Sequence, residues 1–175
     1  MTLAQVNSLD RERFVAALGE VFEHSPWVAE AAWSMRPFAT VDGLHAAMVA
    51  AMHSASEPAQ LALIRAHPEL AGKAAIRGEL TADSETEQSG AGLDRCSPAE
   101  YARLQELNRA YNEKFGFPFI IAVKGLDRTA IIGRFAERVG RDRAQEFDEA
   151  LQQIARIAWF RLEGLIENRR QGSRP

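Results

Sequence analysis

Phe117-Pro118-Phe119-Ile120-Ile121-Ala122-Val123 is the one stretch of this 175-residue sequence that reads like a β-strand. A strand needs a neighbour to pair its backbone N–H and C=O groups, and no second run of this kind is present to supply one. We therefore predict a buried extended segment whose backbone groups are satisfied by helix ends, by side chains or by a ligand. Without a sheet, the predicted fold class is all-α.

The rest of the sequence shows the periodicity and the start signals of helices. Ser97-Pro98-Ala99-Glu100 combines an N-cap serine, a proline at the first helical position and a glutamate placed for a capping box. Asp127 is placed to cap the following helix, and Ser56-Glu57-Pro58 begins the helix that leads to His67. We predict a single-domain bundle of about seven to nine helices over residues 1–175, with the tail from about residue 169 frayed. The main expected helices cover residues 9–22, 26 to just before Pro37, 41–55, 58–66, 98–115, 127–139 and 143–168.

The composition argues against several classes of protein. The net charge of −3 indicates no nucleic-acid partner, and the basic cluster near residue 170 is typical of a solvated tail. Cys96 is the single cysteine, so no intramolecular disulfide can form, and without an adjacent His or Lys we interpret it as an inert thiol. The N-terminus does not read as a signal peptide, and no apolar stretch is long enough to span a bilayer. We expect a cytoplasmic protein with no membrane partner.

His67-Pro68 interrupts helical periodicity where packing supplies no obvious reason. Because the proline ring disfavours the helical conformation of the preceding residue, the helix should end at or next to His67. An imidazole at a helix C-terminus meets the negative end of the helix dipole, which favours its protonated form and suits an acid–base group. The alternative is a helix-ending histidine beside a turn, with no chemical role.

Arg161 lies close to the apolar stripe of the last predicted helix. At 100° per residue it sits only about 50° from the centre of that stripe, so its guanidinium needs an anionic or carbonyl partner. It could hold a carboxylate or a urea-like carbonyl in a pocket. Alternatively, its stem packs against the core while its head reaches water.

Glu87 and Gln88 could present adjacent acceptor and donor groups to a polar substrate. Glu87 could equally be the third-position residue of a capping box that begins at Ser84. The histidines at positions 24, 45 and 53 lack the spacing that zinc hydrolases use, and no phosphate-binding loop or nucleophilic serine motif is present. We therefore expect no metal site.

Three segments, taken in order, resemble those of the OHCU decarboxylases, which act on 2-oxo-4-hydroxy-4-carboxy-5-ureidoimidazoline in urate breakdown. His67-Pro68-Glu69-Leu70-Ala71-Gly72-Lys73 resembles the histidine motif of that family. Residues 84–93, Ser-Glu-Thr-Glu-Gln-Ser-Gly-Ala-Gly-Leu, resemble its Ser-x-x-Glu-Gln-x-x-Ala-Gly-Leu segment. Residues 115–125 resemble its Phe-Gly-Phe-Pro-Phe-Ile signature, and the similarity extends to Ile157-Ala158-Trp159-Phe160-Arg161-Leu162.

The resemblance implies an all-helical fold, usually homodimeric, that takes a small ureidoimidazoline substrate and uses no metal or organic cofactor. It implies that His67 matches the catalytic histidine and that Glu87 and Arg161 match positions that contact the substrate. The remaining implied substrate-binding residues are Pro68, Gln88, Phe119, Ile120, Ile121, Ala122 and Val123.

The implied reaction is a decarboxylation that yields (S)-allantoin. The C=N bond of the imidazoline can receive the electron pair that departing CO2 leaves behind, and His67 would exchange a proton with the ring hydroxyl or the resulting enol. One alternative is a non-enzymatic helical interaction module, in which the three polar residues serve helix ends or the surface. Another is an enzyme with the same scaffold that acts on a different ureide.

Overall fold

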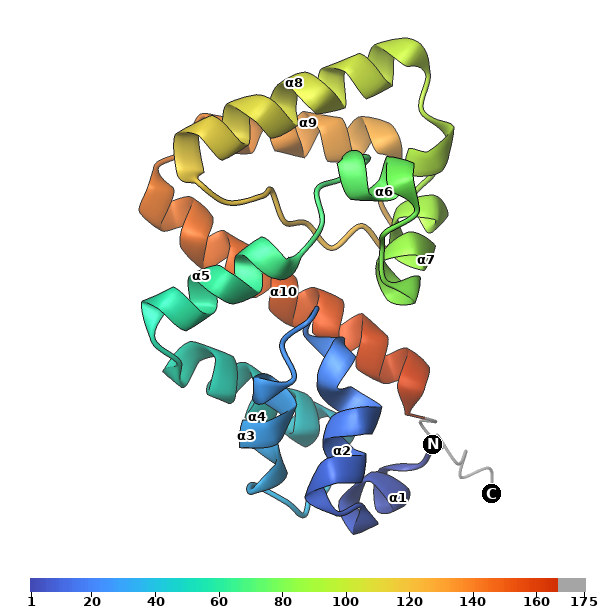
Figure 1. The fold of residues 1–175 in the computed structure, drawn as a ribbon, viewed down its shortest axis with the longest axis vertical. Helices are drawn as coiled ribbons and strands as arrows, with labels where there is room; N and C mark the ends of the chain where they lie inside the picture. Colours follow the sequence, from blue (N-terminus) through green and yellow to red (C-terminus); the bar gives the residue numbers. More distant parts are fainter. Residues whose placement is uncertain (167–175) are drawn as a thin grey trace, which may run out of the picture. The chain divides into compact units, whose positions relative to one another are not determined.

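The computed structural model describes residues 1–166, and in that part of the chain it contains α-helices and two 3-10 helices but no β-strand (Figure 1). The all-α prediction is confirmed. The elements are α1 (Leu3–Ser8), α2 (Arg11–Leu18), η1 (Gly19–Val21), α3 (Trp27–Trp33), α4 (Val41–Ser54), α5 (Glu57–Ala66), α6 (Lys73–Arg77), α7 (Ala82–Gly90), η2 (Leu93–Arg95), α8 (Pro98–Phe115), α9 (Arg128–Val139) and α10 (Arg143–Leu165). These ten α-helices include three short ones, α1, α6 and α7, that are not among the seven expected from periodicity. The predicted frayed tail from residue 169 lies outside the described residues.

The chain forms two compact units. We call Met1–Gln60, together with residues 157–166, the terminal unit, and Leu61–Arg156 the central unit. In the terminal unit, α2 packs on α3 and α3 on α4. Their inward faces supply fully buried side chains, among them Phe14, Leu18, Leu44, Met48 and Met52.

In the central unit, α8 and α9 pack side by side, and the chain between them returns along them without forming helix or strand (Figure 1). Tyr111 of α8 is fully buried and makes edge contacts with the rings of Phe117, Phe119 and Phe135. Phe119 also stacks on Phe135 of α9, with ring centroids 3.9 Å apart. These aromatic contacts anchor the start of the extended segment to the two helices.

The start of α8 follows the sequence signals. The Ser97 hydroxyl accepts a hydrogen bond from the Glu100 N–H at 3.2 Å, and the Glu100 carboxylate accepts one from the Ser97 N–H at 2.8 Å, so the predicted capping box is confirmed. Asp127 caps α9 as predicted, because its carboxylate accepts from the Ala130 N–H at 2.8 Å. α8 ends at Gly116, whose φ of +76° is a left-handed conformation that glycine adopts without strain.

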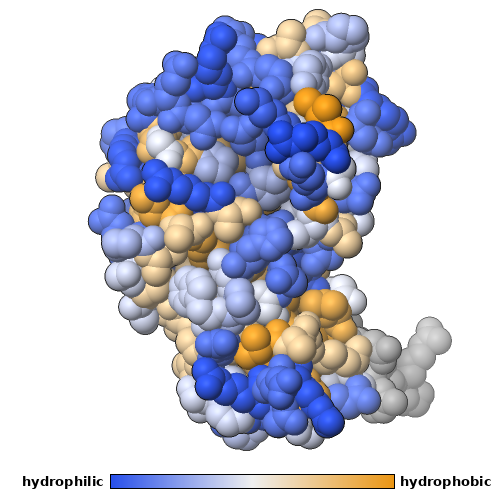
Figure 2. Space-filling model, viewed as in Figure 1, coloured by the Kyte–Doolittle hydropathy of each residue, from blue (hydrophilic) through white to orange (hydrophobic). Residues whose placement is uncertain are grey.

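The surface of the central unit seen in Figure 2 is mostly hydrophilic, with isolated hydrophobic spots. Ile76 on α6 and Tyr101 on α8 are its exposed large apolar residues within the described part of the chain. None of the helices in residues 1–166 is both long enough and apolar enough to cross a bilayer.

Candidate functional site: a clamped histidine loop and an extended segment

His67 is held in one orientation by the end of α5. The helix stops at Ala66, and the His67 N–H still bonds the Ile64 carbonyl at 3.2 Å. The ring Nδ1 lies 3.0 Å from the Leu63 carbonyl oxygen. Because a carbonyl oxygen can only accept, Nδ1 must carry the hydrogen and donate it. The residue is 6% exposed. This contact assigns Nε2 as the ring atom that can take up or deliver a proton.

The loop that follows His67 is tied to α7 by the side chain of Gln88. Its Oε1 accepts from the Ala71 N–H at 2.9 Å, and its Nε2 donates to the Glu69 carbonyl at 3.3 Å. Ala71 has a φ of +49°, a left-handed conformation that costs free energy for a residue with a Cβ. Gln88 is 7% exposed, so these two hydrogen bonds take the place of hydrogen bonds to water for its side-chain amide and for the two backbone groups.

Three side-chain amides on one face of α8 hold the same loop from the other direction. Gln105 donates to the Ala71 carbonyl at 2.8 Å, and Asn108 donates to the Leu70 carbonyl at 3.0 Å. Asn112 donates to the Glu69 carboxylate at 2.5 Å. Positions 105, 108 and 112 share one helix face, since residues three and four apart are neighbours on a helix. Together with Gln88, these amides fix the backbone that follows the histidine.

Glu87 lies in the middle of α7, where it is partly exposed. The N-cap of α7 is Thr81, whose hydroxyl accepts from the Ser84 N–H at 3.3 Å. The alternative that Ser84 begins a capping box closed by Glu87 is therefore wrong, because Ser84 already lies inside the helix. The position of Glu87 next to Gln88 places it beside the residue that clamps the histidine loop.

A pocket of about 400 Å³ lies in the central unit, lined by Ala71, Gln88 and Cys96 among others. Burial raises the pKa of the Cys96 thiol, and the Glu100 carboxylate adds to that effect. Cys96 is therefore a protonated thiol near neutral pH, as its sequence context predicted. The pocket adjoins the amide of Gln88 but offers no activated nucleophile.

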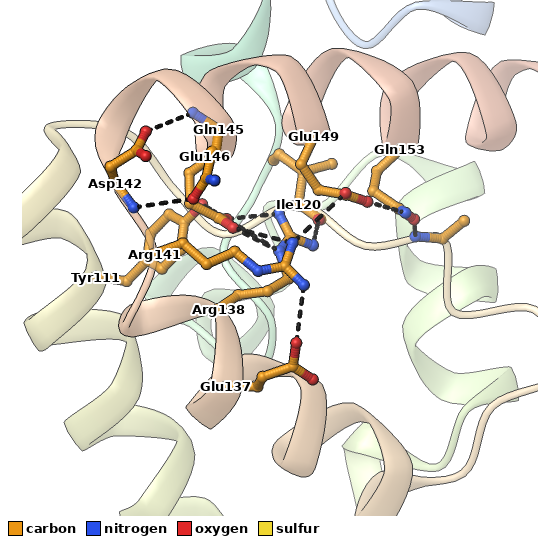
Figure 3. A network of polar contacts seen from close by, with 11 residues as sticks. Tyr111, Ile120, Glu137, Arg138, Arg141, Asp142, Gln145, Glu146, Glu149 and Gln153 are labelled. Carbon is orange, nitrogen blue, oxygen red and sulfur yellow. Dashed lines mark hydrogen bonds and ion pairs between the residues drawn. The ribbon is translucent and has the colours of Figure 1, made fainter.

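Helix side chains satisfy part of the backbone of the extended segment, as predicted. Residues 117–123 are buried and form neither helix nor strand. Arg138 Nη1 of α9 donates to the Ile120 carbonyl at 2.8 Å, and Gln153 Oε1 of α10 accepts from the Ala122 N–H at 2.9 Å (Figure 3). Two of the five predicted substrate-binding positions at residues 119–123 are therefore held in place by side chains of α9 and α10.

Arg138 is itself held by a buried charge network (Figure 3). Its Nε and Nη2 lie 2.9 and 2.8 Å from Glu146 Oε2, and both residues are almost completely buried. The Tyr111 hydroxyl donates to the same carboxylate at 2.5 Å. Burial raises the pKa of Tyr111 well above its ordinary value, and the hydrogen bond to Glu146 raises it further. Tyr111 therefore stays protonated, and a hydrogen-bond donor to Glu146, at neutral pH.

Arg161 lies in the terminal unit, where it forms the ion pair that its place near the apolar stripe required. Its Nη1 lies 2.7 Å from Glu23 Oε2 and 3.3 Å from the Glu20 carbonyl oxygen. The side chains of Arg161 and Glu23 are 4% and 2% exposed. The prediction of an anionic or carbonyl partner is confirmed, and the alternative of a guanidinium in water is wrong. A carboxylate on one nitrogen fixes the plane of the guanidinium fork.

Sequence reasoning found the two backbone segments but missed the side chains that hold them. The missed residues that contact these segments are Gln105, Asn108, Asn112, Arg138 and Gln153. Also missed were Glu23 and Glu146, which pair with Arg161 and Arg138. A usable signal existed for the amides of α8, because polar amides at positions 105, 108 and 112 lie beside the apolar Leu104 and Leu107 on an inward face. Within the described residues, no group of three or more His, Cys, Asp or Glu side chains is arranged to hold a metal ion.

These features define an all-α protein in which an imidazole of fixed tautomer ends a helix inside a clamped loop. The sequence profile described as OHCU decarboxylase matches residues 7–163, and the chain belongs to this family. A relative from Haloferax volcanii, named 2-oxo-4-hydroxy-4-carboxy-5-ureidoimidazoline decarboxylase, is 48% identical over 162 residues, covering 93% of this chain and 94% of the relative. A relative of the same name from Halalkalicoccus jeotgali is 46% identical over 165 residues, covering 94% and 92%.

The fold also resembles a solved structure. A crystal structure of (S)-allantoin synthase superposes with a TM-score of 0.78 at 31% identity, covering 95% of this chain and 55% of that chain. The present chain therefore spans about half the length of that solved chain.

Proposed function

We propose that this protein is a carboxy-lyase that converts 2-oxo-4-hydroxy-4-carboxy-5-ureidoimidazoline to (S)-allantoin in the breakdown of urate. Membership of the OHCU decarboxylase family and two full-length relatives that carry the name of this decarboxylase support the proposal. The observation that carries it is the fixed orientation of His67, whose Nδ1–H is committed to the Leu63 carbonyl. An imidazole with one nitrogen committed in this way offers the other for proton transfer.

In the proposed reaction the bond between the ring carbon and the carboxylate breaks, and CO2 leaves. The electron pair forms a new carbon–carbon double bond within the ring, while the electrons of the C=N bond move to nitrogen, which takes a proton. The resulting enol then loses its hydroxyl proton and gains a proton on the adjacent ring carbon. His67 Nε2 exchanges protons in these steps, and delivery to one face produces a single enantiomer.

We propose that Glu87 and Arg161 also take part in catalysis. Glu87 accepts hydrogen bonds from the N–H groups of the ureido substituent, and Arg161 holds a carbonyl or carboxylate. The pairing of Arg161 with Glu23 supports this role, because it orients the guanidinium without exposing it to water. The proposed substrate-binding residues are Pro68, Gln88, Phe119, Ile120, Ile121, Ala122 and Val123.

The reaction as proposed needs no organic cofactor or metal, since the substrate supplies its own electron sink. We further propose that residues 1–175 form a single functional domain, and that the protein is a cytoplasmic homodimer. Light scattering tests the oligomeric state, and a mass of twice the 19.4 kDa of one chain is the expected result.

The activity is tested by producing the substrate from urate with upstream enzymes and following circular dichroism. Rapid appearance of the signal of one allantoin enantiomer upon addition of the protein is the expected result. Slow formation of racemic allantoin at the same rate with and without the protein would refute the proposed activity.

A further inference from the structure

Within residues 120–122, side chains of the protein bond the extended segment through one of its two backbone edges, while the Val123 carbonyl at its end accepts from the Leu126 N–H at 2.9 Å. The two groups held by side chains are the Ile120 carbonyl, bonded by Arg138, and the Ala122 N–H, bonded by Gln153. In an extended chain, the N–H and C=O of one residue point to the same side, and those of the next residue point to the opposite side. The backbone groups of residues 120 and 122 therefore share an edge. The N–H and C=O of Ile121 then face the opposite edge.

Ile121 is 5% exposed, yet within residues 1–166 its backbone makes no hydrogen bond. Buried backbone groups are almost always paired, because an unpaired one costs free energy comparable to a lost hydrogen bond. The edge opposite the two clamps is therefore the one that gains most from a polar ligand. Keeping it turned toward a ligand requires that the register of the segment be fixed.

Gln153 is suited to fix that register because its amide has a defined orientation. Its Nε2 donates to Glu149 Oε1 at 2.7 Å, one turn earlier on α10 (Figure 3). A carboxylate accepts only, so the amide nitrogen must face Glu149 and the amide oxygen must face the Ala122 N–H. Glu149 in turn lies 3.6 Å from Arg141, which keeps the carboxylate in place.

The buried Glu146 likewise fixes the orientation of the Arg138 side chain. The side chains of Arg138 and Gln153 are therefore both oriented before any ligand binds. We propose that Gln153 and Arg138 are positioning residues of the decarboxylase. They hold the backbone of residues 120–122 and so determine which of its two edges faces the substrate. This inference rests on the proposed function and assigns no direct substrate contact to either side chain.

Gln153→Met tests the inference, because methionine fills a similar volume but offers the Ala122 N–H no comparable acceptor. Loss of one backbone clamp should raise KM for the ureidoimidazoline by about tenfold, the equivalent of one hydrogen bond, while kcat changes much less. Gln152→Met is the matched control, since Gln152 is the exposed neighbour on the same helix, and its KM should equal that of the wild type. A general loss of folding would instead lower the active fraction and leave KM unchanged.

Glu149→Met provides a second variant that leaves Gln153 in place but removes the group that orients its amide. Its KM should rise about threefold, because the freed amide can rotate and the hydrogen bond forms only part of the time. Unchanged KM in both folded variants would overturn the inference while leaving the proposed function intact. A wild-type protein that does not act on the substrate would overturn the proposed function and this inference together.

Discussion

His67 owes its tautomer to the carbonyl of Leu63, one turn earlier on α5. Pro68 ends the helix at that point. The imidazole therefore lies at the helix end, where it contacts one of the carbonyls that the last turn of a helix leaves unpaired. The sequence predicted the helix end, because proline restricts its predecessor. It could not predict which ring nitrogen would be engaged, since that depends on the side-chain rotamer of a buried residue.

Gln88 is expected to stabilise the histidine loop as well as to take part in binding. Gln88→Ala removes the bonds to the Ala71 N–H and the Glu69 carbonyl and should lower the free energy of unfolding by about 1–3 kcal/mol. Chemical denaturation measures the change. Ser89→Ala, at the next position of α7, is the control and should cost much less, and equal losses in the two variants would contradict this role.

Tyr111 should ionise only when the protein unfolds at high pH. Burial raises its folded-state pKa above the unfolded value of about 10, so its contribution to stability is complete below that pH and is lost as pH rises further. Since the chain has two tyrosines, the Tyr101→Phe variant isolates the signal. Its tyrosinate absorbance should appear together with the loss of helical circular dichroism, and ionisation of the folded protein would contradict the prediction.

At the scale of elements, helices with a strong start signal were predicted within a residue or two of their observed beginnings. α8 begins after Ser97 and α9 after Asp127 because each cap satisfies backbone N–H groups that the helix leaves unpaired. α7 was not among the expected helices, and the capping-box alternative put its start at Ser84 because Thr81 and Ser84 are both acceptable caps three residues apart. The choice between them depends on packing of the preceding loop, which no local pattern encodes.

The capping box of α8 should make a pH-dependent contribution to stability. Hydrogen bonds from the Ser97 backbone and hydroxyl lower the pKa of Glu100, and Arg128 lowers it further. The contribution is therefore present above the unfolded pKa of about 4.3 and is lost as pH falls through the lower folded value. Ser97→Ala should lower the free energy of unfolding by about 1 kcal/mol near neutral pH.

Denaturation at pH 7 and at pH 3 distinguishes the cap from a packing effect. The difference between wild type and Ser97→Ala should shrink as the pH falls and the Glu100 carboxylate takes up a proton. A difference that stays constant with pH would contradict the contribution of Glu100.

The clamps of the site could not be predicted from sequence because their hydrogen-bond partners are backbone groups of distant segments. Gln105 contacts Ala71, and Gln153 contacts Ala122, 34 and 31 positions away along the chain. A backbone N–H or C=O group has no sequence signature, so only the clamping side chain could be suspected. The extended segment, in comparison, could be predicted, because its composition is typical of a strand and differs from that of the predicted helices around it.

At the scale of the whole molecule, the prediction of one domain over residues 1–175 can be tested by unfolding. A single domain of this size should unfold in one cooperative step. Coincident thermal transitions by circular dichroism and tryptophan fluorescence are the expected result. Two separated transitions would indicate that the terminal and central units unfold independently, contrary to the single-domain prediction.

The most direct test of the account is the rate at which His67→Asn forms (S)-allantoin, followed by circular dichroism with freshly generated substrate. Asparagine retains polarity but cannot exchange a proton as the imidazole does, so we expect a fall in kcat of about 10²–10⁴-fold, with any residual product racemic. Helical circular dichroism and product binding should match the wild type. Formation of (S)-allantoin by this variant at the wild-type rate would contradict the central role of His67.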